Sequence, residues 1–342
     1  MVPAFCRLLS DLEERYGRVA MHNNKSSFSR REFVKQSAAA VCGIGAMSLS
    51  FGLGAAENAP QTPGKPNSKY AGVQLGLNVP YSFCEPQMSG DDILKNCVQL
   101  GVSAVELRMQ PVEVFLGAPK DLVFPKKSNG ASDAAKRMAE WRKSAAIERV
   151  GEFRKKYETA GVLIDVVKVD GIFKMSDAEL DYAFGIAKAL GARAISTEIA
   201  HKDEELKRVG QYADKHQFWV GYHGHATTTP AHWEKAFSLA KFNGANVDIG
   251  HFVAGNNTSP VPFIKEHHDR ITHLHLKDRK FHEGPNMPFG EGDTPIAEVL
   301  RLLRDNRWNI QAAIEFEYKV PAGSTRMAEI ARALKFCRDA LA

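Results

Sequence analysis

The sequence has few cysteines, and those it has form no pattern. A disulfide framework needs a dense and even set of cysteines, and a cysteine-based zinc site needs closely spaced pairs. The five cysteines of this chain are odd in number and widely separated: Cys6, Cys42, Cys84, Cys97 and Cys337. The sequence therefore offers neither a disulfide scaffold nor a CxxC metal site.

An excess of one charge and long apolar runs are also missing. The chain carries a net charge of +5, but residues 1–56 hold seven Lys or Arg against four Asp or Glu. The rest of the chain therefore carries only about +2, which argues against nucleic acid as a partner. After residue 56 no apolar run is long enough to cross a membrane, and the hydrophobic share of 44% is ordinary for a folded globular chain.

A recognisable leader lies near the N-terminus. Ser29–Lys35 reads Ser-Arg-Arg-Glu-Phe-Val-Lys and precedes a weakly apolar run, residues 37–56, that ends in Gly-Ala-Ala. This segment resembles a twin-arginine export signal at every motif position, and the small residues suit a signal peptidase. The resemblance implies export to the periplasm by the twin-arginine machinery. The alternative, an Ala-rich membrane anchor, is disfavoured because four glycines make residues 37–56 a poor spanning helix.

These features divide the chain into three parts. Residues 1–56 form the predicted twin-arginine signal region, within which Met21 would begin a leader of ordinary length. Residues 57–70 contain three prolines and are expected to be a flexible spacer. Residues 71–342 form one folded domain, which is expected to carry the function.

Within this domain, short β-branched runs alternate with charged stretches of helical period. Strands are predicted at Val73–Val79, Ala104–Arg108, Val162–Val169, Ala194–Ile199, Phe218–His225, Ala245–Gly250, Ile271–Lys277 and Gln311–Phe316. Helices are predicted at Asp91–Leu100, Ala134–Ala160, Asp177–Leu190, Glu204–His216, Ala231–Phe242, Pro295–Asn306 and Ser324–Leu341. Gly101, Gly161, Gly191 and Gly244 are expected to end helices. The alternation predicts an α/β fold, a single (β/α)8 TIM barrel preceded by an export leader.

A doubly wound open sheet is the alternative architecture. Such a sheet usually carries a Gly-rich phosphate-binding turn after its first strand, whereas Leu77–Pro80 here reads Leu-Asn-Val-Pro. The barrel is therefore favoured. Its two longest connections, residues 109–133 and 278–294, are candidate lids over the pocket.

Polar residues gather where the predicted strands end. The period of two in a strand places His273, His275 and Lys277 on one face of the segment 271–278. Other strand ends supply further groups that can bind a metal or move a proton: Glu106, Lys168, Glu198, His223, His225, Asp248, His251 and Glu315. Since barrels build their sites at the C-terminal ends of strands, these groups are expected to converge. A purely structural role for the histidines stays open.

Five segments carry a resemblance to a known family: Tyr222–His225, Val247–His251, His273–Asp278, Pro288–Asp293 and Ile314–Glu315. In this order, residues 70–340 resemble the xylose-isomerase-like sugar isomerases and epimerases. The resemblance implies one divalent metal, Mn²⁺, Mg²⁺, Co²⁺ or Zn²⁺, held by Asp248, His275 and Glu315. The fourth ligand is either Glu198 or His223, and we favour Glu198 because carboxylates with one histidine suit Mn²⁺, Mg²⁺ or Co²⁺.

The resemblance also implies roles for the other strand-end residues. Glu315 would be both ligand and base, and Glu198 and His223 are the other candidate groups for proton transfer. Substrate contacts are expected from His225, His251, His273, Lys277, Glu106 and Lys168. For His251 and Lys277, a supporting hydrogen bond or an ion pair with Asp278 is an equal alternative.

Together these expectations predict a metal-dependent isomerase or epimerase of an unphosphorylated sugar or keto-sugar. It would work by α-proton abstraction and a metal-stabilised enediolate. The alternatives are a lyase or hydrolase of oxidised (keto) glycosides on the same barrel, and a non-catalytic carbohydrate-binding barrel. A DNA-repair endonuclease of the same fold is disfavoured by the near-neutral charge of the body. The expected partners are a small sugar and the twin-arginine export machinery, and a homo-oligomer is left open.

Replacing Arg30 and Arg31 by Lys keeps the charge of the leader but removes the guanidinium pair that an export receptor would read. We expect the double variant to stay in the cytoplasm in folded form. Cell fractionation measures the distribution, and Lys25→Arg, after Met21 but outside the motif, is the matched control. Normal delivery of the double variant to the periplasm would contradict the twin-arginine interpretation.

Overall fold

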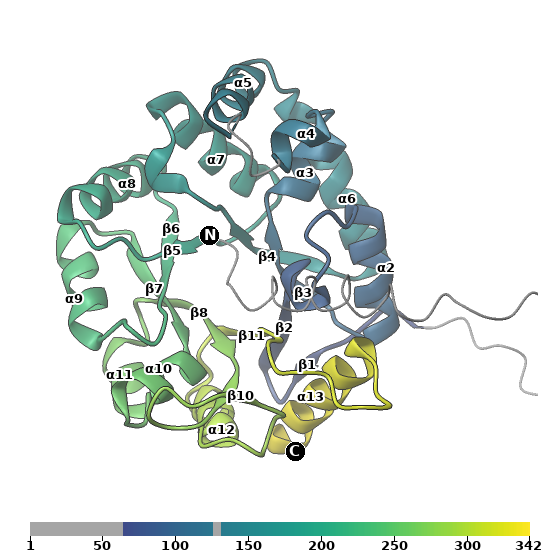
Figure 1. Cartoon of the computed structure of the whole chain (residues 1–342), viewed down its shortest axis with the longest axis vertical. Coiled ribbons are helices and arrows are strands. Elements are labelled where there is room, and N and C mark those ends of the chain that lie inside the picture. Colours follow the sequence, from purple (N-terminus) through teal and green to yellow (C-terminus); the bar gives the residue numbers. More distant parts are fainter. Residues whose placement is uncertain (1–63, 126–130) are drawn as a thin grey trace, which may run out of the picture. The chain divides into compact units, whose positions relative to one another are not determined.

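The computed structural model describes residues 64–125 and 131–342, without the side chains of residues 131 and 132. The predicted signal region, the alternative start at Met21 and residues 57–63 of the predicted spacer lie outside these described residues. Within the described part, no helix is long and apolar enough to span a membrane. Figure 1 shows this part as a ring of helices around a central set of strands.

Eight parallel strands close into a barrel, so the predicted (β/α)8 fold is confirmed. In chain order they are β2 (Val73–Val79), β3 (Ala104–Arg108), β4 (Leu163–Lys168), β5 (Ala194–Glu198), β6 (Trp219–His223), β7 (Asn243–Asp248), β8 (Ile271–Leu276) and β11 (Gln311–Ile314). Each strand pairs with the next, and β2 closes the barrel by pairing with both β3 and β11. A short strand β1 (Lys69–Tyr70) adds to β2 in antiparallel orientation.

The strands are buried on both faces because helices cover the outside and side chains fill the inside. The covering helices are α2 (Gly90–Leu100), α6 (Val150–Ala160), α7 (Asp177–Ala189), α8 (Asp203–His216), α9 (Pro230–Leu239), α12 (Ile296–Asn306) and α13 (Arg326–Leu341). Local signals set their limits: Ser176 and Glu179 form a capping box at the start of α7. Gly101 and Gly161 end α2 and α6 with positive φ, as predicted.

Two local predictions are wrong. Residues 134–160 form two helices, α5 (Ala131–Lys143) and α6, because they pack against different partners: Met138 of α5 joins a small separate cluster, while Phe153 of α6 enters the main core. Gly244 lies inside β7 and ends no helix. A Cβ atom there would meet the backbone oxygen of Arg270 at 2.7 Å, so the close approach of β8 explains this glycine.

The connections after the strands contain structure that the sequence did not predict. Four short helices lie there: α3 (Gln110–Phe115), α4 (Lys120–Val123), α10 (Ile249–Asn256) and α11 (Val261–His267). In the connection 278–294, β9 (Asp278–Arg279) pairs with β10 (Asn286–Met287). The Asp278 carboxylate accepts hydrogen bonds from three backbone N–H groups of that connection, those of Gly290, Gly292 and Thr294. This candidate lid is therefore tied to the end of β8.

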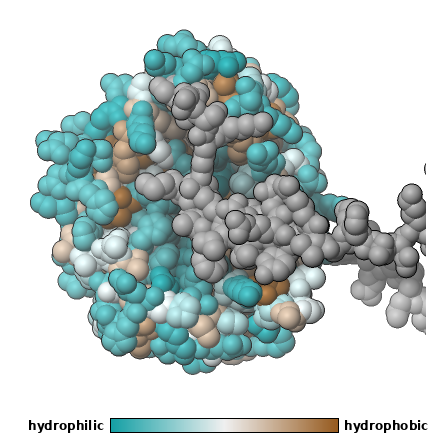
Figure 2. All heavy atoms as spheres, in the orientation of Figure 1, coloured by the Kyte–Doolittle hydropathy of each residue, from teal (hydrophilic) through white to brown (hydrophobic). Residues whose placement is uncertain are grey.

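The outer surface is mostly hydrophilic on the face seen in Figure 2. Among the described residues, the large hydrophobic side chains that stand out to solvent are Leu163, 52% exposed, and Phe281, 37% exposed. Two separate residues do not make an apolar patch of the size that marks a protein interface. The polar groups inside the barrel are therefore the more informative feature.

Two glycines inside helices make a matched test of the packing. A Cβ atom at Gly255 in α10 would meet the backbone oxygen of Ala226 at 1.7 Å, whereas nothing lies within 4 Å of one at Gly185 in α7. We expect Gly255→Ala to lower the free energy of unfolding by about 1–3 kcal/mol through overpacking. Gly185→Ala should leave it equal or raise it by up to about 1 kcal/mol. Urea unfolding measures both, and equal stability of the two variants would contradict the packing of α10.

Candidate metal centre

The polar residues predicted from the strand ends do come together at the C-terminal ends of the barrel strands. Parallel register places Glu198 of β5 beside His223 of β6, and Asp248 of β7 beside His275 of β8. Glu315 follows β11 directly, and its backbone N–H donates to the oxygen of Leu276 in β8. The barrel thus brings residues far apart in the sequence to one end of the fold.

Four of these residues form a group that fits a metal ion. The donor atoms of His223, Asp248, His275 and Glu315 lie within 4.8 Å of one another, and all four residues are buried. Three of the atoms make no hydrogen bond: His223 Nδ1, Asp248 Oδ2 and His275 Nδ1. Asp248 Oδ2 and His275 Nδ1 do lie within 3.3 Å of Lys277 and Glu315, respectively, whereas His223 Nδ1 has neither a hydrogen bond nor an ion pair. A cation bound between these residues would give all three atoms a partner. Two imidazoles and two carboxylates are a donor set that suits a first-row divalent metal.

Helix α10 fixes one of these ligands. Asp248 is the N-cap of α10, and its Oδ1 accepts a hydrogen bond of 2.8 Å from the backbone N–H of His251. This contact turns Oδ2 toward the other three residues of the group. Burial raises the pKa of Asp248, and the nearby Lys277 opposes that shift.

Glu106 and His273 lie on the far side of His275 from Glu315. The Nε2 of His275 forms a hydrogen bond with Glu106 Oε2, while its Nδ1 lies 3.3 Å from Glu315 Oε2. The Nε2 of His273 lies 3.6 Å from the same Glu106 oxygen. Both Glu106 and His273 have 0% exposure. Both lie beside His275, and Glu106 orients its ring as carboxylates do for metal-binding histidines. The substrate contacts expected of Glu106 and His273 stay predictions.

The charge states follow from these contacts. Burial lowers the pKa of His275, but Glu106 and Glu315 more than offset this and raise it to about 10 without a metal. Coordination through Nδ1 would displace that proton. Burial holds the pKa of His223 well below its usual range, so this imidazole is neutral, as a ligand must be.

Glu198 lies outside the four-residue group. Its carboxylate contacts Lys168 Nζ at 2.7 Å and His225 Nε2 at 2.6 Å, and the side chains of Glu198 and His225 are 47% and 50% exposed. Burial raises the pKa of Glu198, but Lys168 and the two neighbouring histidines lower it by more. The net pKa lies below the usual one, so Glu198 stays ionised. The hydrogen bond to Glu198 raises the pKa of His225. Glu198 and His225 are therefore a charged pair at the mouth, and His223 takes the place in the group for which Glu198 was favoured.

Lys277 follows β8 and is surrounded by acids. Its Nζ lies 3.0 Å from Asp248 Oδ2, 2.9 Å from Glu315 Oε2 and 2.6 Å from Glu317 Oε2. It also lies 2.9 Å from His251 Nε2. Its expected alternative, an ion pair with Asp278, is not among these contacts, since Asp278 binds backbone N–H groups instead. Burial lowers the pKa of Lys277, but the carboxylates raise it to a net value above the usual one.

Glu315 is ionised, as expected, and neighbouring groups hold both of its oxygens. Burial raises its pKa, while Lys277 and His275 lower it more strongly, so the net pKa is well below the usual range. Asn78 also donates a hydrogen bond of 2.9 Å to Glu315 Oε1. A carboxylate held in this way suits metal coordination better than proton abstraction.

Several residues of the site were missed by the sequence reasoning. Asn78 holds Glu315, Asn246 lies 3.1 Å from His275 Nε2, and Arg279 lies 2.8 Å from His251 Nδ1. The Tyr81 hydroxyl donates a hydrogen bond to Glu317, and Glu317 forms an ion pair with Lys277. Asn246 could have been found, because it precedes Asp248 by two residues and faces the same side of β7. Asn78 stood beside Pro80 at the end of a predicted strand, but a lone amide is a weak signal.

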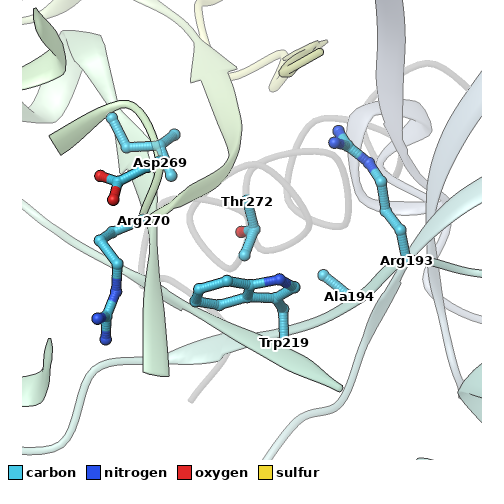
Figure 3. A pocket seen from close by; sticks show the side chains of 7 residues that line it. Arg193, Ala194, Trp219, Asp269, Arg270 and Thr272 are labelled. Atoms are coloured by element: carbon cyan, nitrogen blue, oxygen red, sulfur yellow. The ribbon is translucent and has the colours of Figure 1, made fainter. Parts of the chain in front are cut away.

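A hollow of about 220 Å³ lies elsewhere, among the residues that begin β5, β6 and β8. Figure 3 shows Trp219 at its centre, with Arg193 and Arg270 on opposite sides. Both arginines are engaged: Arg193 binds Asp165, and Arg270 binds backbone carbonyl oxygens, including that of Asn243. This is the N-terminal end of the barrel, where polar residues serve stability, so the hollow does not compete with the metal centre as a catalytic site.

The fold and the group of ligands at its C-terminal end define the class, a TIM barrel with a candidate metal centre. Residues 181–340 match the family model described as xylose isomerase-like TIM barrel. The chain is therefore similar to this family over the second half of its barrel. No curated protein matches it.

Solved structures share the fold at low sequence identity. The IOLI protein with a bound zinc atom is 14% identical in sequence and has a TM-score of 0.55. The match covers 79% of this chain and 98% of the IOLI chain. D-psicose 3-epimerase from Clostridium cellulolyticum H10, with D-tagatose, is 12% identical, covering 79% and 99%, with a TM-score of 0.54. The 3-keto-D-glucoside 4-epimerase YcjR from E. coli is 13% identical, covering 78% and 99%, with a TM-score of 0.51.

The two candidates for the fourth ligand can be separated by metal affinity. We expect Asp248→Ala, His275→Ala and His223→Ala each to weaken divalent metal binding by more than about 100-fold. Losing a residue that only supports a ligand costs up to about that much, and losing the ligand itself should cost more. Glu198→Ala should keep the ion, because Glu198 lies outside the group. Mn²⁺ titration by calorimetry measures the affinities. Unchanged affinity in His223→Ala with loss in Glu198→Ala would restore Glu198 as the ligand.

Proposed function

We propose that this protein is a metal-dependent isomerase or epimerase of an unphosphorylated sugar or keto-sugar. One observation carries the proposal: four buried residues with metal-type donor atoms, three of which make no hydrogen bond, lie beside a half-exposed carboxylate–imidazole pair. The first group would hold a divalent cation, and the second can exchange a proton with a substrate. The structures of zinc-bound IOLI and of two sugar epimerases share this fold and support the choice.

The ligands in this proposal are His223, Asp248, His275 and Glu315. When bound, a divalent cation would polarise a substrate carbonyl and stabilise negative charge on its oxygen. Glu106 keeps the Nδ1 of His275 directed into the group. Asn78 and Lys277 hold the carboxylate of Glu315. The chain thus supplies a rigid and largely water-free set of donors.

Proton transfer is assigned to Glu198 and His225. The ring centroids of His223 and His225 are 4.8 Å apart, so the pair adjoins the metal ligands while remaining open to solvent. Ionised Glu198 can take a proton from the carbon beside the substrate carbonyl, and protonated His225 can donate one to an oxygen. Lys168 holds Glu198 in place through its other oxygen. Glu315 remains a ligand because it is buried and Asn78 and Lys277 hold its two oxygens, whereas Glu198 is half-exposed.

The charges at the mouth favour a neutral substrate. Arg108, Lys168 and Lys277 lie at the ends of β3, β4 and β8, and each is already paired with at least one carboxylate. A phosphate group would have to compete with Asp170, Glu198 and Glu315 for these cations. The mouth therefore suits hydroxyl groups better than a phosphate, in agreement with the export that we propose for the chain on the basis of its leader. Delivery to the periplasm would separate the enzyme from cytoplasmic sugar phosphates.

A lyase acting on an oxidised glycoside is the second candidate. Elimination begins with removal of the same proton beside a carbonyl, and it needs an acid for the leaving group. His225 is half-exposed and its pKa is raised by Glu198, so it could serve as that acid. The products distinguish the two reactions, because a lyase releases the aglycone and an epimerase does not.

Glu198→Gln tests the assignment of the base. The change keeps the shape and hydrogen-bonding reach of the side chain but removes its basicity, so we expect deuterium uptake from D₂O into a keto-sugar substrate to fall by at least about 10²-fold. Metal content should be unchanged. Uptake is measured by NMR over a panel of ketoses and 3-keto glycosides.

Glu205→Gln is the matched control for this experiment, since Glu205 lies on the neighbouring α8 and outside the site. It should exchange the proton at the wild-type rate. If Glu198→Gln with its metal also exchanged at that rate, the base would have to be Glu315 or His223. Sugar binding by the metal-loaded wild type with no exchange on any substrate would instead favour a carbohydrate-binding barrel.

A further inference from the structure

A second potential cation position adjoins the metal group. The donor atoms of His251, Glu315 and Glu317 lie within 4.8 Å of one another, as metal ligands do. The space between them holds the ammonium group of Lys277, at 2.9 Å from His251, 2.9 Å from Glu315 and 2.6 Å from Glu317. A positively charged group of the chain itself therefore occupies a set of metal-type ligands.

The two positions share ligands. Lys277 Nζ also lies 3.0 Å from Asp248 Oδ2, so Asp248 and Glu315 belong both to the metal group and to the surroundings of the lysine. Paired metal sites in enzymes are commonly about 3.5–4 Å apart. The geometry is therefore that of a two-cation centre in which the second cation is an ammonium group.

The number of donors around Lys277 supports this view. An ammonium group has three N–H bonds, but four acceptor groups surround Lys277 Nζ. The acceptor that receives no N–H bond is Asp248 Oδ2. This atom is fully buried and makes no hydrogen bond, although Lys277 Nζ is 3.0 Å away. A metal ion accepts four or more ligands from all directions, so this position has the coordination number of a metal site and not of a lysine pocket.

We propose that Lys277 acts as a built-in cation at the second position of a two-metal centre, and thereby limits this chain to one metal ion. The inference rests on the metal centre of the proposed function and concerns how many ions that centre accepts. Removing the lysine leaves Asp248, Glu315 and Glu317 without their cation and opens space between them. A second divalent ion should enter, and Glu317 and His251, which are both partly exposed, border a route for it.

Metal stoichiometry tests the proposal. Wild type, Lys277→Ala and Lys277→Met are dialysed against Mn²⁺, and the manganese bound per chain is measured by elemental mass spectrometry. We expect one ion in the wild type and two in Lys277→Ala, which loses both charge and bulk. Lys277→Met keeps the bulk and should hold one. Lys168→Ala is the matched control, because this lysine is buried at the end of β4 but contacts Glu198 and none of the metal ligands. It should also hold one.

Electron paramagnetic resonance gives a second readout. Two Mn²⁺ ions that share the Glu315 carboxylate should produce a spin-coupled spectrum in Lys277→Ala, whereas a remote additional ion should not. Adding Glu317→Gln to Lys277→Ala removes a ligand of the second position only, and should return the count to that of the wild type. Lys277→Ala could require metal to fold. In that case, adding Mn²⁺ should restore the circular dichroism spectrum of the folded protein, and the refolded variant should hold two ions.

The outcomes separate this proposal from the one on which it rests. A wild type that binds no ion would contradict the proposed metal-dependent function. A Lys277→Ala variant that holds no more ions than the wild type, in folded form and at saturating Mn²⁺, would overturn the role of Lys277 alone. An extra ion without spin coupling, or one that survives Glu317→Gln, would also overturn it.

Discussion

The arrangement at the barrel mouth depends on one constraint, the need to balance carboxylates that have been removed from water. Glu106 and Asp248 are fully buried, Glu315 is nearly so, and each faces at least one basic group. Leaving one partner of such a buried pair unmatched commonly costs about 3–5 kcal/mol. Lys277 and protonated His275 supply positive charge without a metal, and a divalent ion would add more. This balance explains why acids and bases alternate so regularly at the strand ends.

The barrel could be read from the sequence because its strands are short, β-branched and repeated eight times, and β2 and β3 have the predicted limits. The convergence of polar groups was predictable for the same reason, since parallel strands end together. The fourth member of the metal group was not, because Glu198 and His223 are register neighbours and only side-chain direction separates them. The division of residues 134–160 into two helices depends on packing partners that a helical period does not reveal.

The two ends of the barrel use charge differently. At the N-terminal end, Arg193 and Arg270 bind Asp165 and backbone carbonyl oxygens, so their charge holds the chain together. At the other end, Glu198 and His225 remain half-exposed, and the metal group retains unpartnered atoms. Satisfied polar groups stabilise a fold, while unsatisfied ones mark places where a ligand completes the structure. The hollow around Trp219 and the candidate metal centre therefore lie at opposite ends of the barrel.

Asp248 serves two structural purposes with one side chain. Its Oδ1 caps helix α10 and its Oδ2 faces the metal group, so each oxygen meets a separate requirement. Asn or Ser could begin the helix equally well but would be poorer ligands for a cation. Either residue at position 248 would therefore keep the start of α10 while removing one carboxylate from the metal group. The fold and the cation site can thus be separated at a single position.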